Sequence, residues 1–416
     1  MDNKFTKWLR ENYSKIINSI AFYPAIIAIG FLILSVLMQE FDFSAAGKHI
    51  KASASWISLR DANTARAIVS TIAGGIISLT VFSFSMVMIV LNQAASQMSN
   101  RMLEGMIANR FQQFVLGVYI GSIVYALSLL TTIRDIDSGI YIPALSIYLL
   151  LLITVVDIFI FIYFLHYVTQ SVKFQTIISR VHDDTIRSLK QLNTEKPPTA
   201  FLLPNWNKET VCMESSGYFQ GFNKKQLINF AQNNEGIIHF LKPASTYLLK
   251  GIPLLDFYSL KKLDEDKLKE IFYPIDFYDG QEIQLNSYYG FHQLAEVALK
   301  ALSPGINDPE TAVLSLHAIT DLFSYKLNHF TQSIFEDENG VVRIQTRDWT
   351  FEEFFAKSFY PIWEYGKKDL YIQNAMLQMV GQLRECDVSG SYTVLFTHFL
   401  SKVNKQIEQN QFERID

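Results

Sequence analysis

The sequence predicts a multi-pass α-helical membrane domain with four spans, followed by an α+β cytoplasmic domain. Four long apolar runs fall within the first 170 residues, whereas the rest of the chain mixes amphipathic helical patterns with short strand-like runs. Hydrophobic residues make up 49% of the 416 residues and charged residues only 18%, a balance typical of a protein partly in lipid and partly in water. We therefore expect a transmembrane domain over 1–170, an amphipathic connecting helix and linker over 171–199, and the cytoplasmic domain over 200–416.

The four apolar runs approach or exceed the length of about 20 residues that a helix needs to cross a bilayer. We expect the spans at Ser19–Met38, Ala67–Leu91, Phe114–Thr131 and Ile140–Tyr167. Basic residues precede the first span and follow the fourth, and such residues remain preferentially in the cytoplasm. Both termini are therefore expected to be cytoplasmic, although the connector 39–66 also carries basic residues.

Small and polar residues form a narrow stripe along the second span. They recur at helical spacing and are Ser70, Gly74, Ser78, Ser85 and Asn92. A helix that faces only lipid has no use for such a stripe, so two interpretations stay open. In the first, the stripe lines the axis of a homo-oligomeric ring, with Arg101 at its cytoplasmic mouth. In the second, the stripe packs against Gly117 and Gly121 of the third span.

Asp157 is the ionisable residue inside the fourth span. A charge inside a membrane costs a few kcal/mol, so such a residue is a functional candidate by default. The alternative is that Asp157 lies near the cytoplasmic end of the span and bonds a neighbouring helix. In either case we expect it to be buried against protein, with Ser83, Ser122 and Tyr125 as candidate partners.

The C-terminal half has the alternation of an α+β domain. An amphipathic helix over 171–193 is expected to continue the fourth span and to pack against a sister subunit or the soluble domain. Strands are expected at 209–213, 217–219, 236–241, 246–249 and 341–345, and helices at 223–233, 285–302, 309–329, 351–359, 362–383 and 392–409. Residues 242–254 are loosely similar to a biotinyl/lipoyl-like hairpin turn, which we interpret as structural and without a cofactor.

The best polar constellation of the soluble half surrounds the turn Ser303–Glu310. Its members are Asn286, His292, Asn307, Asp308, Glu310 and His317. They could hold an ion or ligand, but a tight interhelical turn with Asp308 as helix cap explains the same residues, and we favour that interpretation. Phosphate-loop, dinucleotide, nucleophile-elbow and zinc motifs are absent, so no metal or cofactor is expected and an enzyme is less favoured. A net charge of −4 without basic clusters among aromatics argues against a nucleic-acid partner.

Two segments resemble the DUF2254 family of bacterial membrane proteins. The first runs from Ala65 to Leu130 and contains ARAIVSTIAGGIISLTVFSFSMVMIVLNQAASQMSNR and QQFVLGVYIGSIVYALSLL, and the second is ALSPGINDPETA at Ala301–Ala312. The chain departs from the family pattern at Asn100, where a proline is usual, and at Asn109, where an acidic residue is frequent. The resemblance implies the architecture and a bacterial inner membrane, but it implies no activity.

Two functions from different classes fit these observations. The favoured one is an oligomeric channel or transport-related protein in the lipid bilayer, with a cytoplasmic regulatory domain whose ligand is unknown. Its support is the stripe of the second span, the intramembrane Asp157 and a helix that continues from the fourth span into the domain. The alternative is a non-transporting membrane sensor or scaffold, in which the stripe only packs helices.

Overall fold

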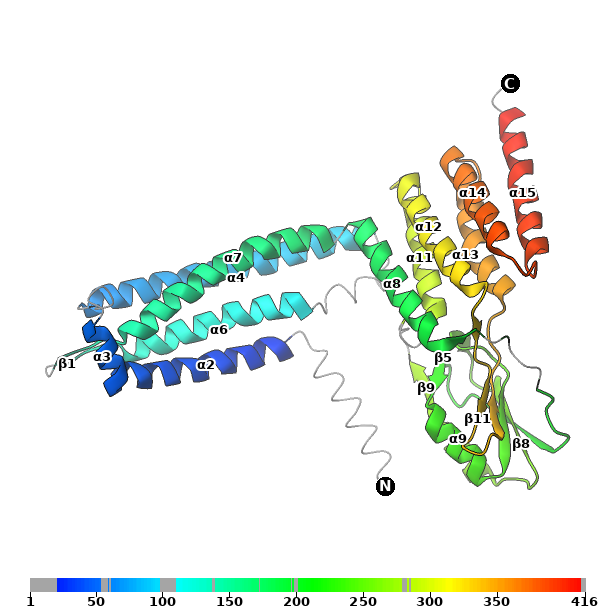
Figure 1. The fold of residues 1–416 in the computed structure, drawn as a ribbon, viewed down its shortest axis with the longest axis horizontal. Helices are drawn as coiled ribbons and strands as arrows, with labels where there is room; N and C mark the ends of the chain where they lie inside the picture. The colour runs from blue at the N-terminus through cyan, green and yellow to red at the C-terminus, as the bar shows by residue number, and fades with distance from the viewer. Residues whose placement is uncertain are drawn as a thin grey trace. The chain divides into compact units, whose positions relative to one another are not determined.

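A computed structural model of the chain describes residues 21–53, 59, 61–97, 110–136, 139–171, 173–195, 197, 201–278, 283 and 286–412. The chain divides into two compact units, Met1–Lys173 and Phe174–Asp416 (Figure 1). The first unit is helical, and the second combines sheets with a group of helices.

Four helices of the described residues are long and apolar enough to cross a membrane, as predicted. They are α2 (Phe22–Phe43), α4 (Ala62–Gln97), α6 (Arg110–Thr132) and α7 (Ala144–Ser171). A short helix α3 (Ala45–Ser53) follows α2, and the paired strands β1 (Arg134–Ile136) and β2 (Gly139–Tyr141) connect α6 to α7. The chain is therefore a multi-pass membrane protein.

Helix α2 is longer at its C-terminal end than the sequence predicted. The expected span ended at Met38, whereas the helix continues to Phe43 and includes Glu40 and Asp42. The chain then turns sharply into α3, and a Cβ atom at Gly47 would overlap the carbonyl oxygen of Phe41. Glycine is required at this turn because any larger residue would push α3 away from the end of α2.

Gly117 and Gly121 of α6 pack against α2. A Cβ atom at Gly117 would lie 2.7 Å from Ile27 Cδ1, and one at Gly121 would lie 2.6 Å from Phe31 Cδ2. The close-packing pattern was correctly predicted, but the partner is the first span, so the interpretation in which the stripe of the second span meets these glycines is wrong. Helix α4 instead buries a different face, made of Ala62, Ala65, Val69, Ala73 and Ile76.

The amphipathic helix predicted over 171–193 is α8 (Phe174–Leu192), and it belongs to the second unit. The prediction that it continues the fourth span is wrong, because α7 ends at Ser171 and Lys173 is not helical. Its apolar face packs on α11 (Ser287–Ala301) and α12 (Pro309–Lys326). Burial of this face therefore holds α8 within the second unit.

Two sheets form the strand-containing part of the second unit. The five-stranded sheet has the order β11 (Ile334–Glu336), β12 (Val342–Gln345), β6 (Gly236–Phe240), β8 (Pro253–Ser259) and β4 (Asn207–Cys212), and its only parallel pair among the described strands is β12 with β6. The three-stranded sheet has the order β7 (Thr246–Leu248), β5 (Gly217–Phe222) and β9 (Ile275–Tyr278). Because β6 and β7 belong to different sheets, the hairpin expected from the biotinyl/lipoyl-like similarity is wrong.

One shorter strand pairing and two helices complete this part. Strand β3 (Asn193–Thr194) pairs with β10 (Phe330–Thr331). Helix α9 (Lys224–Asn233) has the predicted cap, since Asn223 accepts a hydrogen bond from the Gln226 amide at 3.1 Å. Helix α10 (Glu265–Glu270) precedes β9.

The C-terminal helices gather on one side of the second unit (Figure 1). After α11 and α12 come α13 (Phe351–Gly366), α14 (Leu370–Cys386) and α15 (Thr393–Phe412). The predicted break near Pro361 is wrong, because that proline lies inside α13. The break falls later, where Asp369 caps α14 by accepting hydrogen bonds from the amides of Tyr371 and Ile372. Burial of the neighbouring Ile362 and Trp363 holds α13 together across the proline.

Gly290 sets the distance between α8 and α11. A Cβ atom at this position would overlap the side chain of Thr185, which is itself buried. We therefore expect Gly290→Ala to destabilise the protein by about 1–3 kcal/mol, the usual cost of overpacking. Thermal unfolding of the full chain measures this loss. The matched control is Gly381→Ala in α14, where an added Cβ meets nothing within 4 Å. Equal melting of the two variants would show that the contact has no energetic weight.

Candidate functional site

A buried polar cluster lies inside the membrane unit, around Asp157. Asp157 is at the middle of α7 and fully buried, as the prediction that it packs against protein requires. Ser83 comes from α4, and Tyr119 and Ser122 come from α6. The Ser122 hydroxyl lies beside the Asp157 carboxylate, and the Tyr119 hydroxyl lies near both Ser83 and Asp157. Three helices thus bring four polar side chains to one point.

Several polar atoms of the cluster lack a well-aligned hydrogen-bond partner within the described part of the chain. Neither carboxylate oxygen of Asp157 has a hydrogen-bond partner there, and the hydroxyls of Ser83, Tyr119 and Ser122 have none either. Buried polar groups are almost always paired, and an uncompensated charge at mid-membrane costs several kcal/mol. Such an arrangement can bind a proton or a cation, because Ser122 can satisfy only part of the acceptor capacity of the Asp157 carboxylate.

A cavity of about 160 Å³ adjoins this cluster. Ser83 and Tyr119 line it together with Gln113, whose buried amide oxygen also lacks a partner among the described residues. The volume exceeds the roughly 10–15 Å³ that one ordered water requires. Most of its wall is apolar, and it reaches the cluster through Ser83 and Tyr119 only.

The sequence predicted two other members of the Asp157 cluster and missed a third. Ser122 lies beside Asp157 as expected and Ser83 lies beside Tyr119, but Tyr125 donates instead to the carbonyl oxygen of Ser146 at 3.2 Å. Tyr119 was missed, although it precedes Ser122 by three residues on one helix face, and that spacing was the available signal.

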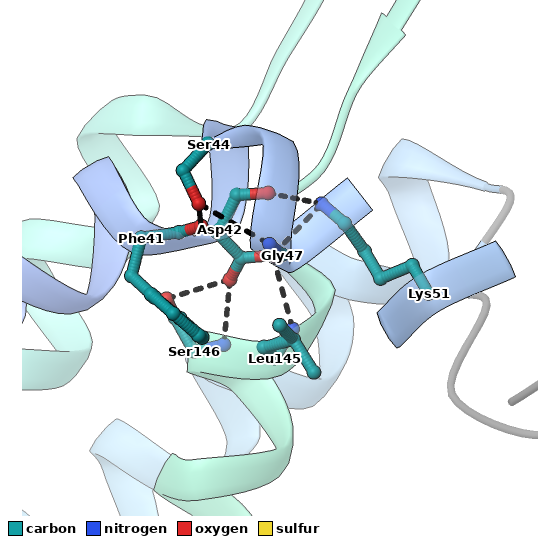
Figure 2. Close-up of polar contacts among 7 residues, drawn as sticks. All are labelled: Phe41, Asp42, Ser44, Gly47, Lys51, Leu145 and Ser146. Atoms are coloured by element: carbon teal, nitrogen blue, oxygen red, sulfur yellow. Dashed lines mark hydrogen bonds and ion pairs between the residues drawn. The ribbon is translucent and has the colours of Figure 1, made fainter. Parts of the chain in front are cut away.

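Asp42 forms a second buried site, at the end of α2 (Figure 2). Its carboxylate accepts hydrogen bonds from the Ser146 amide at 2.7 Å, the Ser146 hydroxyl at 2.8 Å and the Leu145 amide at 3.3 Å. Lys51 Nζ lies 2.9 Å from the same carboxylate and donates at 2.6 Å to the Asp42 carbonyl oxygen. Because Leu145 and Ser146 are in the first turn of α7, Asp42 acts as a cap supplied by another helix.

The predicted stripe of the second span is exposed within the unit. Ser70, Gly74, Ser78, Ser85 and Asn92 all lie on the outer surface of α4. The Ser78 and Ser85 hydroxyls donate to carbonyl oxygens one turn earlier, at 2.9 and 2.8 Å, so these side chains need no further partner in lipid. Arg101, the predicted mouth residue, lies outside the described residues.

The turn between α11 and α12 has the predicted capping geometry. Asp308 accepts hydrogen bonds from the Thr311 amide at 3.1 Å and the Thr311 hydroxyl at 2.6 Å, and Asn307 has a φ of +49°. Asn307, Glu310 and His317 are exposed. Asn286 is at the opposite end of α11, so the polar constellation expected around this turn does not come together. The part of the chain that the structure describes contains no group of three or more side chains placed to hold a metal ion.

Comparisons with known proteins agree with this architecture. The uncharacterized protein MT1328 of Mycobacterium tuberculosis (strain CDC 1551 / Oshkosh) is 23% identical over 355 residues, which cover 79% of this chain and 66% of that protein. The uncharacterized protein Mb1321c of Mycobacterium bovis has the same identity and coverage. The chain thus spans just under two thirds of the length of these relatives. No solved structure gives a significant match.

A family model adds the broader assignment. The model described as "Predicted membrane protein (DUF2254)" matches residues 17–382, which include the four membrane helices and most of the second unit. The match covers far more than half of the 416 residues. The chain belongs to the DUF2254 family of predicted membrane proteins.

Proposed function

We propose that this protein is an ion-transporting homo-oligomer of the bacterial inner membrane, with both termini in the cytoplasm and the second unit as its regulatory domain. The observation that carries the proposal is the Asp157 cluster. A buried carboxylate at mid-membrane, beside three unpaired hydroxyls and a cavity, has the chemistry of a site for a proton or cation.

The exposed stripe of α4 supports assembly. Ser70, Gly74 and Ser78 have small side chains, so little projects from this surface of the helix. Cβ atoms added at Gly74 and Gly75 would meet nothing within 4 Å. Small residues let helices approach closely in a membrane, and homo-oligomers usually close into symmetric rings. In such a ring one copy of α4 from each subunit faces the axis. Asp157 is then buried among the helices of each subunit, away from the exposed stripe of α4.

Ser78→Phe tests this placement of α4. We expect the variant to lower ion flux from liposomes by about tenfold or more, because a ring of large apolar side chains closes a narrow pathway. The matched control is Ile77→Phe, since Ile77 is exposed at the same depth but outside the stripe. The oligomer mass in detergent is measured for both variants.

The outcomes separate the possible roles of the stripe. Loss of flux with an intact oligomer supports the axial placement, whereas loss of the oligomer makes the stripe a contact between subunits. Equal behaviour of Ser78→Phe and Ile77→Phe contradicts both roles. An intact oligomer that carries no proton, cation or anion would contradict transport and favour a membrane sensor or scaffold.

A further inference from the structure

The second unit contains a cavity of about 530 Å³ that none of the preceding roles uses. It lies where the three-stranded sheet meets the first turn of α11 and the segment between β12 and α13. Small-molecule sites in proteins typically measure about 300–1,000 Å³, so the cavity has the size of a ligand site.

Aromatic rings form much of the cavity wall. They are Phe219, Phe222, Tyr288, Phe335, Trp349 and Phe354. The rings of Tyr288 and Trp349 stack with centroids 5.2 Å apart and planes 16° apart. Trp349 is held in place because its Nε1 donates to the carbonyl oxygen of Ala244 at 2.9 Å. The wall therefore offers a fixed, flat surface suited to a planar ring.

Three helices begin at this cavity. Lys224 is the first residue of α9, Ser287 is the first residue of α11, and Trp349 directly precedes the cap of α13. The N-terminal end of a helix carries a partial positive charge and favours anions. The ends of α9 and α11 favour a ligand with negative charge, whereas the first turn of α13 already carries Glu352 and Glu353.

The ionised side chains around the cavity also favour an anion. Asp348 lines it but is offset by Lys326, which is buried against the Phe354 ring at 4.5 Å. Arg347 is offset by Glu353, whose carboxylate lies 3.6 Å away. What remains is Lys224 and Asp276 at the wall, together with Lys357, whose Nζ lies 3.6 Å from the Trp349 ring centroid. The four ionised side chains that line the cavity, Lys224, Arg347, Asp276 and Asp348, balance to zero, and Lys357 adds a positive charge beside the Trp349 ring.

Asn286 adds a buried donor to the wall. Only 5% of this residue is exposed, and its Oδ1 accepts a hydrogen bond from the Tyr288 amide at 3.1 Å. That bond fixes the orientation of the side-chain amide, yet its Nδ2 has no partner among the described residues. A buried donor without a partner is costly, and a ligand acceptor would satisfy it.

From these features we infer that the cavity binds a nucleotide. The heteroaromatic base stacks in the aromatic part of the wall, beside Trp349 and Tyr288, and the phosphate lies by Lys224 and the first turn of α11. Stacking on an aromatic side chain contributes to base binding, and phosphate at a helix N-terminus is a favourable contact. The inference concerns the second unit alone and stands whether or not the membrane unit transports ions.

Titration of the full-length protein in detergent tests the inference. The probes are adenosine monophosphate, guanosine monophosphate, adenosine and inorganic phosphate, and binding is followed by calorimetry. We expect at least one monophosphate to bind about tenfold or more tightly than adenosine or phosphate alone, because both halves of the site are then occupied. Absence of binding by both monophosphates would overturn the proposal.

A pair of lysine variants locates the binding. Lys224 lines the cavity, whereas its neighbour Lys225 is also exposed but does not. Lys224→Gln should weaken nucleotide binding about tenfold, as expected for the loss of one hydrogen bond to a charged group, and Lys225→Gln should leave it unchanged. Equal effects of the two substitutions would place the nucleotide elsewhere and overturn the assignment.

Discussion

Replacing Asp42 with alanine is expected to cost the membrane unit about 3–5 kcal/mol, because it breaks a buried ion pair by removing one partner. The carboxylate joins α2 to the first turn of α7 through the amides of Leu145 and Ser146 and also holds Lys51 (Figure 2). Without it, those amides lose their acceptor, and the ammonium group of Lys51 loses its ion pair and keeps only the Asp42 carbonyl oxygen. In a single domain, a loss of this size is a large fraction of the total stability.

A matched control is available on the same helix. Glu40 precedes Asp42 by two residues and is exposed, so Glu40→Ala removes a carboxylate without breaking a buried contact. Asp42→Asn retains an acceptor oxygen for the α7 amides but not the charge, and its loss should fall between the other two. Unfolding of the detergent-solubilised protein, followed by circular dichroism, ranks the three variants. If Asp42→Ala unfolds together with Glu40→Ala, the link between α2 and α7 is not a source of stability.

The second large effect is expected at Asp157, and it concerns flux instead of stability. Asp157→Asn keeps the shape of the side chain and removes the charge that would hold a proton or cation. Loss of one charged group weakens binding by about 1.5–3 kcal/mol, which corresponds to roughly ten- to a hundredfold. Because no protein group neutralises this carboxylate within the described residues, the variant should fold at least as well as the parent.

The sequence was a good guide to the membrane helices because their signal is local. A bilayer requires a long apolar run, and hydropathy alone locates it. The ends of the helices were harder to predict from the sequence, as Asp42 illustrates. Its charge suggested a connector. Asp42 nevertheless stays in α2, because amides in the first turn of α7, about a hundred residues later, donate hydrogen bonds to its carboxylate. No local pattern reports such a partner.

The same distinction applies to the second unit. Asp308 and Asn223 were predicted as caps from residue type and position, and both capping bonds are present. Strand β8 was not predicted, although it is at the interior of the five-stranded sheet between β6 and β4. Its segment begins with Pro253 and contains the buried Asp256, so neither alternation nor composition indicated a strand.

The Asp157 cluster and the cavity of the second unit also differ in how far the sequence predicts them. Asp157 stood out because an ionisable residue within a span is rare. The cavity of the second unit was not predicted, since its wall combines residues from 191 to 354 and none of them forms a spaced motif. Only the fold brings the aromatic rings, Lys224 and Asn286 to one place.

The most direct measurement is ion flux through the purified protein in liposomes, for the parent and for Asp157→Asn. Thr154→Val serves as the control, since Thr154 is one turn away on α7 and its hydroxyl already donates to the Leu150 carbonyl oxygen at 2.8 Å. We predict that the parent and Thr154→Val carry protons or a monovalent cation at equal rates, and that Asp157→Asn lowers that flux about tenfold or more and removes its pH dependence. Flux that is unchanged in Asp157→Asn, in both rate and pH dependence, would contradict the proposed ion site.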